Sequence, residues 1–187
     1  MPAPLYVTLV HRPVVDRHGR IVTTSITNMD VHDIARSGRT YGLRRFFVVH
    51  PIPGLRSLAD RIVEHWQSGH GSRYNPSRHQ AISIVEVVSD LDRAIAAAEQ
   101  DAGRMPYLVS TSAREIEGAT PFSALRRRLA DDPTPCMLLL GTGYGLADPV
   151  LARCDLHLEP IRGAGDYNHL SVRAAAAIML DRLIGSE

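Results

Sequence analysis

The chain has 187 residues, of which 44% are hydrophobic, and a formal net charge of +1. This length and composition are typical of one globular domain with a single core, and they exclude a disordered chain. All 21 basic residues are arginine, which excludes a phosphate-loop lysine, a Schiff-base lysine and a lysine general base. The net charge gives no global signal for nucleic acid, but a local patch of arginine would be sufficient to bind RNA.

The sequence carries no signal for a membrane, for export or for a metal. No apolar run approaches the roughly 20 residues of a membrane span, and the first residues lack the basic region of a secretory signal. Cys136 and Cys154 are too far apart for a metal knuckle, and the nine histidines show no ligand spacing. We therefore expect a cytoplasmic protein with two free thiols, no bound metal and no membrane partner.

Short apolar runs alternate with amphipathic segments along the whole chain. In chain order, the apolar runs predict strands at residues 4–11, 44–52, 81–89, 106–113, 135–141 and 155–161. The amphipathic segments predict helices at residues 29–42, 55–69, 90–102, 121–132, 148–154 and 169–185. Asp90 and Asn168 are the expected N-caps of the third and the last of these helices. Residues 70–80 show no periodicity and are expected to form a loop.

This alternation predicts an α/β fold. We expect a single domain over residues 1–187, with a mostly parallel sheet of about six strands and helices on both faces. The continuous apolar run at 135–141 is typical of a strand that is buried on both faces. In such sheets ligands bind outside the carboxyl ends of the strands, so the loops that follow strands are the candidate sites.

A glycine-rich segment, LLLGTGYGL at residues 138–146, includes the end of that strand. Glycine lets a ligand approach the backbone, so the N–H groups of this loop become available as donors. The G-x-G-x-G spacing differs from the dinucleotide-binding fingerprint, and a tight turn between a strand and a helix explains it equally well.

Two more loops carry polar groups at strand ends. EPIRGAGDYNHLSVR, residues 159–173, contains glycines, an acid, a tyrosine and a histidine that a capping role for Asn168 does not explain. VSTSA, residues 109–113, ends another strand with hydroxyl groups, which alone are common in turns. If the strands are neighbours, the three loops line one cleft that suits a ligand with an adenine, a ribose and a charged tail. Backbone amides would recognise the adenine, and Asp166 or a hydroxyl would bind the ribose.

A basic cluster surrounds the first predicted helix, which Asn28 or Asp30 would open. Three of its members recur at i, i+4 and i+7 and share one helix face, and two follow at the helix exit. Such groups could bind an RNA phosphodiester, although a solvated helix face is the commoner role of a charged stripe. The cluster consists of His32, Arg36, Arg39, Arg44 and Arg45.

Together these segments resemble the SPOUT RNA methyltransferases, which use S-adenosylmethionine. Asn28 to Arg36 with Gly42, then GTGYGL, then GDYNHLSVRAAAAI follow the order of the three motifs of that family. The resemblance covers nearly the whole chain and is close to the catalytic domain of the tRNA guanine-N1 methyltransferases. The last motif is the specific one, because a glycine loop alone occurs in many folds.

The resemblance implies a C-terminal trefoil knot and a homodimer that binds tRNA or rRNA across both subunits. It also implies S-adenosyl-L-methionine in a bent shape, held by the loops at residues 111–112, 140–146 and 161–171. The implied cofactor-binding residues are Thr111, Ser112, Leu140, Gly141, Thr142, Gly143, Gly145, Leu146, Ile161, Gly163, Gly165, Tyr167, Asn168, His169, Leu170 and Ser171.

Two features of the last motif leave the methylated atom open between a base nitrogen and a ribose 2′-oxygen. Ser171 stands where the ribose-methylating branch often has an asparagine, whereas Gly165 to Tyr167 are closer to the guanine-N1 branch. The downstream RNA-binding domain of that second branch is expected to be absent, since the sequence ends at Glu187.

The resulting hypothesis is methyl transfer from S-adenosylmethionine to RNA. The sulfonium is already activated, so the protein must align the acceptor and remove its proton. Asp166 is the candidate base for a base nitrogen, Arg36 would organise a ribose hydroxyl or its phosphate, and Asn28 matches the first motif. One alternative is a Rossmann-like enzyme that binds NAD through Asp155 or Glu159. The other is a non-catalytic RNA-binding protein that keeps the fold.

Overall fold

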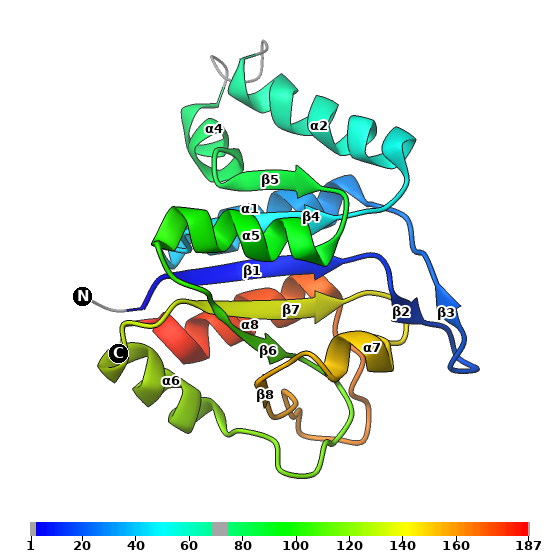
Figure 1. The fold of residues 1–187 in the computed structure, drawn as a ribbon, viewed down its shortest axis with the longest axis vertical. Coiled ribbons are helices and arrows are strands. Elements are labelled where there is room, and N and C mark those ends of the chain that lie inside the picture. The colour runs from blue at the N-terminus through cyan, green and yellow to red at the C-terminus, as the bar shows by residue number, and fades with distance from the viewer. Residues whose placement is uncertain (1–2, 69–74, 187) are drawn as a thin grey trace.

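Figure 1 shows one six-stranded sheet with helices on both of its faces. The computed structural model describes residues 3–68 and 75–186. The strand order is β5-β4-β1-β7-β6-β8, and every neighbouring pair in this sheet is parallel. The α/β class, the parallel sheet and its number of strands are therefore confirmed. The strands are β1 (Leu5–Val10), β4 (Arg45–Val49), β5 (Val85–Val88), β6 (Tyr107–Ser110), β7 (Cys136–Gly141) and β8 (Leu156–His157).

Two groups of helices cover the two faces of the sheet. Helices α1, α4, α6 and α8 contribute buried side chains to one core, and α5 and α7, in front in Figure 1, contribute to the other. No helix in the described ranges is both long and apolar enough to cross a membrane. The helices are α1 (Asn28–Thr40), α2 (Pro53–Gln67), α4 (Pro76–Ile82), α5 (Leu91–Ala102), α6 (Phe122–Asp131), α7 (Asp148–Leu151) and α8 (Val172–Ile184).

Side chains of the central strands alternate between the two cores. In β1, Leu5, Val7 and Leu9 pack on the side of α1 and α8, whereas Tyr6 and Val10 pack on the side of α5. β7 alternates in the same way, and all of its residues except the last are buried. The prediction of a strand buried on both faces at this position is confirmed, because both sides of a central parallel strand are covered by helices.

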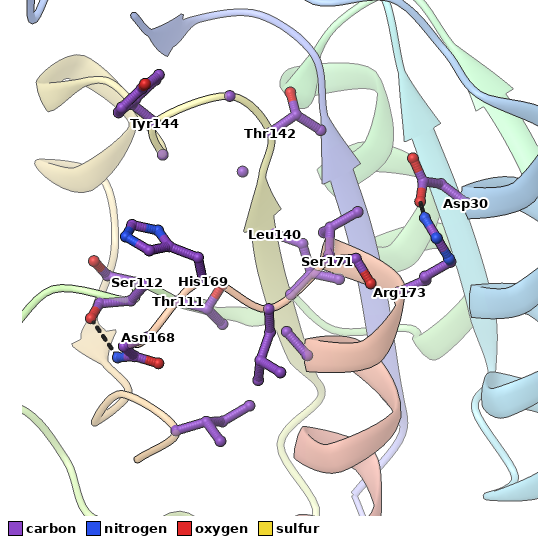
Figure 2. A pocket seen from close by; sticks show the side chains of 18 of the residues that line it. Asp30, Thr111, Ser112, Leu140, Thr142, Tyr144, Asn168, His169, Ser171 and Arg173 are labelled. Atoms are coloured by element: carbon purple, nitrogen blue, oxygen red, sulfur yellow. Dashed lines mark hydrogen bonds and ion pairs between the residues drawn. The ribbon is translucent and has the colours of Figure 1, made fainter. Parts of the chain in front are cut away.

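The carboxyl ends of β7, β6 and β8 meet at one edge of the sheet, because these strands are parallel neighbours. The three polar loops predicted to line one cleft follow these strands, so they converge at this edge. β1 pairs with β7 and ends beside it, which brings the segment after Val10 to the same place. Figure 2 shows the side chains at this edge from close by.

The segment expected to be a loop at residues 70–80 is only partly one. Residues 70–74 lie outside the described ranges, and α4 begins at Pro76 after the N-cap Asn75. An Asn cap followed by proline at the first helical position is a helix start signal, but the helix is too short to show a clear period. Since α4 ends at Ile82, the strand expected from residue 81 begins only at Val85.

One further prediction was wrong in extent, and one element was missed. The strand expected at residues 155–161 is limited to Leu156–His157. A small antiparallel hairpin, β2 (Val14–Val15) with β3 (Ile21–Val22), was not predicted. Strands of two residues carry no periodic signal, so their pairing depends on contacts that the local sequence does not reveal.

The first helix begins one residue earlier than expected. Thr27, rather than Asn28 or Asp30, is the N-cap of α1, and its hydroxyl accepts a hydrogen bond from the Asp30 N–H at 3.1 Å. Asp90 caps α5 as predicted. Such caps satisfy N–H groups that a helix leaves unpaired at its start.

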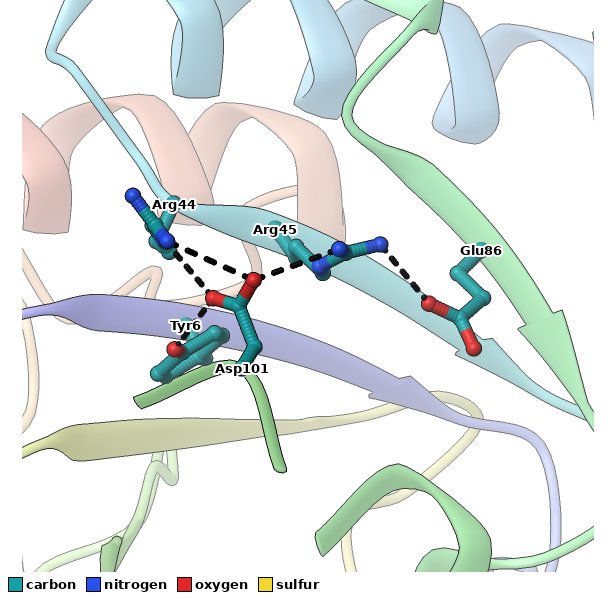
Figure 3. A network of polar contacts seen from close by, with 5 residues as sticks. All are labelled: Tyr6, Arg44, Arg45, Glu86 and Asp101. Atoms are coloured by element: carbon teal, nitrogen blue, oxygen red, sulfur yellow. Dashed lines mark hydrogen bonds and ion pairs between the residues drawn. The ribbon is translucent and has the colours of Figure 1, made fainter. Parts of the chain in front are cut away.

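A charged network lies at the opposite, amino edge of the sheet (Figure 3). Asp101, at the end of α5, accepts hydrogen bonds from the Tyr6 hydroxyl and the Arg44 Nε, both at 2.7 Å. Arg45 donates to Asp101 at 3.2 Å and to Glu86 at 3.1 Å. The Arg44 guanidinium lowers the pKa of Asp101 to about 2, and burial beside Asp101 raises the pKa of Tyr6 to about 12.

This network separates two arginines from the predicted RNA-binding cluster. α1 runs from the carboxyl edge of the sheet to its amino edge, where the Arg44 N–H donates to the carbonyl oxygen of Leu5. Arg44 and Arg45 therefore lie at the edge away from the converging loops, with their guanidinium groups bound to Asp101. Grouping them with the helix face was wrong, because proximity in sequence does not keep a helix exit near its entrance.

The Asp101 network makes stability depend on pH. The pKa of Asp101 in the folded protein lies below the ordinary value of an aspartate, so its ionised form stabilises the protein above pH 4. This contribution is lost as the pH falls towards 2. We expect Asp101→Asn to lower the free energy of unfolding at pH 7 by about 1 kcal/mol, since water screens the half-exposed arginines. Urea unfolding between pH 2 and 7 should show the two proteins converging in acid.

The control for this prediction is Asp92→Asn on the same helix, which removes the exposed ion pair with Arg153. It should change stability by less than about 0.5 kcal/mol. Equal effects of the two substitutions would contradict the role given to Asp101.

Candidate functional site

A cavity of about 940 Å³ opens at the carboxyl ends of β6 and β7. Its walls are the loop after β6, the glycine loop after β7, the loop that leads into α8 with the first turns of that helix, and the segment that leads into α1 (Figure 2). The three loops predicted to share a cleft thus line one cavity, whose volume is typical of small-molecule sites.

Most of the predicted cofactor residues and one predicted catalytic residue line this cavity. Four predicted cofactor residues do not line it: Leu146, Gly163, Gly165 and Tyr167. Leu146 is buried, and Tyr167 is 79% exposed with its ring edge-on to His169. The predicted residues that line the cavity are Thr111, Ser112, Leu140, Gly141, Thr142, Gly143, Gly145, Ile161, Asp166, Asn168, His169, Leu170 and Ser171.

The glycine loop turns back tightly over the end of β7. A Cβ atom at Gly141 would lie 2.7 Å from the backbone nitrogen of Leu146, which no side chain tolerates without a backbone shift. Gly143 and Gly145 have φ angles of +61° and +111°, a region that favours glycine. The three glycines are therefore required by the turn itself, and the backbone of the turn forms part of the cavity wall.

Backbone hydrogen bonds hold the glycine loop against the β2 segment. The Val15 N–H donates to the carbonyl oxygen of Gly145 at 2.9 Å, and the Tyr144 N–H donates to the carbonyl oxygen of Val15 at 3.0 Å. The Gly145 N–H donates within the loop to Thr142. The N–H groups of Tyr144 and Gly145 are therefore already used within the protein. Only the other N–H groups of the glycine loop are available for the predicted recognition of adenine.

Thr24 connects the glycine loop to two buried histidines. Its hydroxyl is hydrogen-bonded to the hydroxyl of Thr142 and to Nδ1 of His11 at 3.0 Å. Its carbonyl oxygen accepts from Nε2 of His50 at 2.9 Å, while Nδ1 of His50 accepts from a backbone N–H. The two rings lie 5.4 Å apart, and both residues are fully buried. Beneath the cavity, this cluster fixes the loop to the ends of β1 and β4.

The loop that leads into α8 is tied to the loop after β6. Asn168 donates from its side chain to the carbonyl oxygen of Ala113 at 2.9 Å, so it does not cap the helix as predicted. Ser171 is the N-cap instead. An ion pair of 2.7 Å between Arg162 and Glu115 adds a second connection. These contacts hold two walls of the cavity together.

The cavity wall contains a charged pair, Arg173 and Asp30, that the sequence did not predict. Arg173, in the first turn of α8, donates to Asp30 in α1 at 3.1 Å (Figure 2). It also lies 3.5 Å from Asp33. Asp30 is only 8% exposed and also accepts from the hydroxyl of Thr27 at 2.6 Å. The two charges are far apart in sequence, so only the packing of α1 against α8 reveals the pair.

The remaining predicted residues lie outside the cavity. Asn28 and Arg39 are exposed, and Arg36 is on the surface of α1, where its nearest acid is Asp33 at 3.9 Å. His32 packs edge-on to the ring of Trp66. Burial and the nearby Arg78 lower the pKa of His32, so its ring is neutral near pH 7 and is a poor phosphate ligand.

Comparison with known proteins identifies the family. A family model described as SAM-dependent RNA methyltransferase matches residues 4–185. The chain belongs to this family. The description of the family names S-adenosylmethionine as the methyl donor and RNA as the substrate class of its members.

Three relatives are close to this chain in sequence. The tRNA (guanine-N(1)-)-methyltransferases of Nitratidesulfovibrio vulgaris and Oleidesulfovibrio alaskensis are 47% and 46% identical over 97% of this chain. The chain spans only 42% of the length of each. An uncharacterized protein of Aquifex aeolicus is 40% identical over 96% of this chain and 87% of its own length.

Solved structures resemble this chain at the level of the fold. A probable methylase family protein from Haemophilus influenzae has a TM-score of 0.62 at 16% identity, over 97% of this chain and 63% of that one. The SpoU methyltransferase AviRb from Streptomyces viridochromogenes, solved with AdoMet, has a TM-score of 0.60 at 19% identity, over 98% of this chain and 58% of that one.

The NAD alternative is contradicted by the family and by the geometry. The carboxylate of Asp155 accepts from the Leu108 N–H at 2.7 Å, and that of Glu159 accepts from the Phe122 N–H at 2.6 Å. Neither residue lines the cavity, so neither can bind a ribose there.

Within the part of the chain that the structure describes, no group of three potential ligands could hold a metal ion.

The buried His11 gives a second pH-dependent contribution to stability. Burial lowers its pKa to about 4, with His50 adding to the effect and Asp30 opposing it. Between pH 6.5 and 4 the unfolded chain therefore binds a proton that the folded chain does not. Stability should fall by up to about 3 kcal/mol as the pH falls through this window, and His11→Asn should flatten the curve. Urea unfolding of the wild type and of His11→Asn at pH 4, 5, 6 and 7 measures the free energy of unfolding of each protein across this window.

The matched control is His18→Asn, which removes an exposed histidine from the β2–β3 hairpin. Its pH curve should coincide with that of the wild type. A His11→Asn protein with the wild-type slope would show that His11 does not contribute this dependence.

Proposed function

We propose that this chain methylates a base nitrogen of tRNA, with S-adenosylmethionine bound in the 940 Å³ cavity. The observation that carries the proposal is the convergence in that cavity of the glycine loop, the loop after β6 and the loop before α8. The two relatives named as tRNA guanine-N1 methyltransferases support tRNA as the substrate and guanine as the first nucleotide to test.

The walls of the cavity fit an adenosyl ligand with a methionine tail. Leu140, Ile161 and Met179 supply apolar surface for the base and the methylene groups. Thr111 has its hydroxyl bound to the carbonyl oxygen of Leu139, whereas Ser112 and other polar lining groups can bind a ribose. Arg173 supplies a cation for the carboxylate of the tail, and Asp30 holds that guanidinium in place.

Asp166 is the residue that would accept the proton. It is an exposed carboxylate in the cavity lining, so an RNA base can approach it without further opening of the protein. A cofactor held by these residues would supply a methyl group on a sulfonium, with S-adenosylhomocysteine as the leaving group. As the acceptor nitrogen gains the methyl group, it loses its own proton to the carboxylate of Asp166. Arg36 and Arg39, on the surface of α1, would contact RNA phosphates outside the cavity.

The same family resemblance supports a C-terminal trefoil knot, a homodimer and a cytoplasmic location. In a dimer, the exposed face of α1 would guide RNA towards the cavity of either subunit. Light scattering on the purified protein tests the dimer directly.

Filling the cavity tests where the cofactor binds. Ala175 lines the cavity from α8, so Ala175→Phe should weaken binding of S-adenosylmethionine and S-adenosylhomocysteine at least 10-fold in calorimetry. Gly143 is less suitable for this test, because a side chain there would meet the carbonyl oxygen of Val15.

Ala177→Phe is the matched control for this binding test, because Ala177 is on the same helix and does not line the cavity. It should leave both affinities unchanged. Binding of S-adenosylmethionine that survives in Ala175→Phe, or its absence in the wild type, would contradict the proposed site.

Removing the proposed proton acceptor tests the mechanism. Asp166→Asn should lower kcat for transfer of a tritiated methyl group to unmodified tRNA transcripts about 100-fold, with cofactor affinity within 2-fold of wild type. Asp131→Asn, at an exposed position outside the cavity, is the control and should keep full activity. Wild-type protein that binds cofactor and tRNA but transfers no methyl group would support the non-catalytic alternative. A product methylated on ribose would contradict a base nitrogen as the acceptor.

A further inference from the structure

A series of hydrogen bonds joins a buried histidine to the glycine loop through two threonines. Thr24 and Thr142 both line the cavity assigned to the cofactor, and their hydroxyl groups are hydrogen-bonded to each other. The Thr142 hydroxyl also lies 3.2 Å from the carbonyl oxygen of Val10, at the end of β1. The Thr24 hydroxyl also lies 3.0 Å from Nδ1 of His11. The four groups therefore form one continuous series that passes through the cavity wall.

The number of donors fixes the direction of this series. A carbonyl oxygen can only accept, so the Thr142 hydroxyl donates its one proton to Val10. Thr142 must then accept from the Thr24 hydroxyl, whose oxygen in turn accepts from Nδ1 of His11. The reverse direction would leave the contact between Thr142 and Val10 without a proton. His11 therefore carries its proton on Nδ1.

The two buried histidines beneath the cavity are thus held in opposite tautomers. Nε2 of His50 donates to the carbonyl oxygen of Thr24, and its Nδ1 accepts from the Ile52 N–H at 3.1 Å, so His50 carries its proton on Nε2. Within residues 3–68 and 75–186, Nε2 of the fully buried His11 has no hydrogen-bond partner. Such a group is unfavourable for stability and calls for another role. The role that the geometry offers His11 is to orient the Thr24 hydroxyl.

We propose that Thr24, oriented by His11, is a positioning residue for the cofactor, because its hydroxyl holds Thr142 and the glycine loop in the shape that binds S-adenosylmethionine. This inference rests on the proposed function and adds to it two residues that act from behind the cavity wall. The proton of the Thr24 hydroxyl goes to Thr142, so Thr24 acts on the ligand through Thr142 rather than as a donor to the ligand itself.

Thr24 supports the part of the glycine loop that remains available to a ligand. The N–H groups of Tyr144 and Gly145 are bound within the protein. The two residues before them, Thr142 and Gly143, both lie against Thr24. Its hydroxyl binds Thr142, and its methyl carbon would lie 3.5 Å from a Cβ built at Gly143. A loop that is held in place before the ligand arrives loses little conformational freedom on binding, which favours affinity.

Two substitutions at Thr24 separate the hydroxyl from the shape of the side chain. Thr24→Val removes the hydroxyl and keeps the shape, so it should weaken binding of S-adenosylhomocysteine at least 5-fold in calorimetry. Thr24→Ser keeps the hydroxyl and should bind within 2-fold of wild type. Thr23→Val is the matched control, because the Thr23 hydroxyl contacts Arg12 and Thr23 does not line the cavity. It should leave the affinity unchanged, and thermal unfolding confirms that each variant is folded.

A double variant tests whether Thr24 acts through Thr142. Thr142→Val should weaken binding by a factor similar to that of Thr24→Val, and the two substitutions together should weaken it no further than either alone. A double variant whose loss equals the product of the two single losses would show that Thr24 contacts the ligand independently, and this would overturn the inference. An unchanged affinity in Thr24→Val would also overturn it.

Two measurements without cofactor test the positioning itself. Hydrogen exchange at the N–H groups of Tyr144 and Gly145 should be at least 10-fold faster in Thr24→Val than in wild type. Nitrogen NMR of the wild type should show His11 protonated on Nδ1 and His50 on Nε2. Unchanged exchange, or a His11 protonated on Nε2, would overturn the inference. Failure of the wild type to bind the cofactor, with both of these results as expected, would instead overturn the proposed function.

Discussion

The close approach of the Leu146 backbone to Gly141 is the contact on which the rest of the site depends. Because there is no Cβ at Gly141, the chain can reverse directly above the end of β7. The reversal brings the next residues within hydrogen-bonding distance of Val15, and Thr142 within reach of Thr24. One wall of the cavity is therefore built from backbone, and its shape is set by close packing rather than by the rotamers of long side chains.

The two edges of the sheet use polar groups in different ways. At the amino edge, Asp101 gathers Tyr6, Arg44 and Arg45 into a network whose members satisfy one another. At the carboxyl edge, the loops place hydroxyl, amide and carboxylate groups around a cavity. Parallel strands make this division possible, because all of their carboxyl ends lie together. The network around Asp101 is thus kept apart from the groups that are available to a ligand.

The sequence was sufficient for most of the helices and strands and for the convergence of the loops, because long segments show a clear hydrophobic period. The strand at 135–141 and the helix from Asn28 to Thr40 are examples, since their apolar patterns match their buried faces. The motif resemblance then identified most of the cavity lining. The sequence was not sufficient for the Asp30–Arg173 pair, whose members are 143 positions apart and meet only through helix packing. It also gave no sign of the short β2–β3 hairpin, which pairs through tertiary contacts.

The pairing of β1 with β7 has a consequence for how the protein folds. Thr142 donates to the carbonyl oxygen of Val10 across 132 positions of the chain, and β1 lies between β4 and β7 in the middle of the sheet. Closing so long a loop costs conformational entropy before the contacts form, which makes sheets of this kind slow to fold. During synthesis, β1 and β4 can pair early, but the glycine loop has no partner strand until β7 has left the ribosome. The cavity is therefore among the last parts of the protein to form.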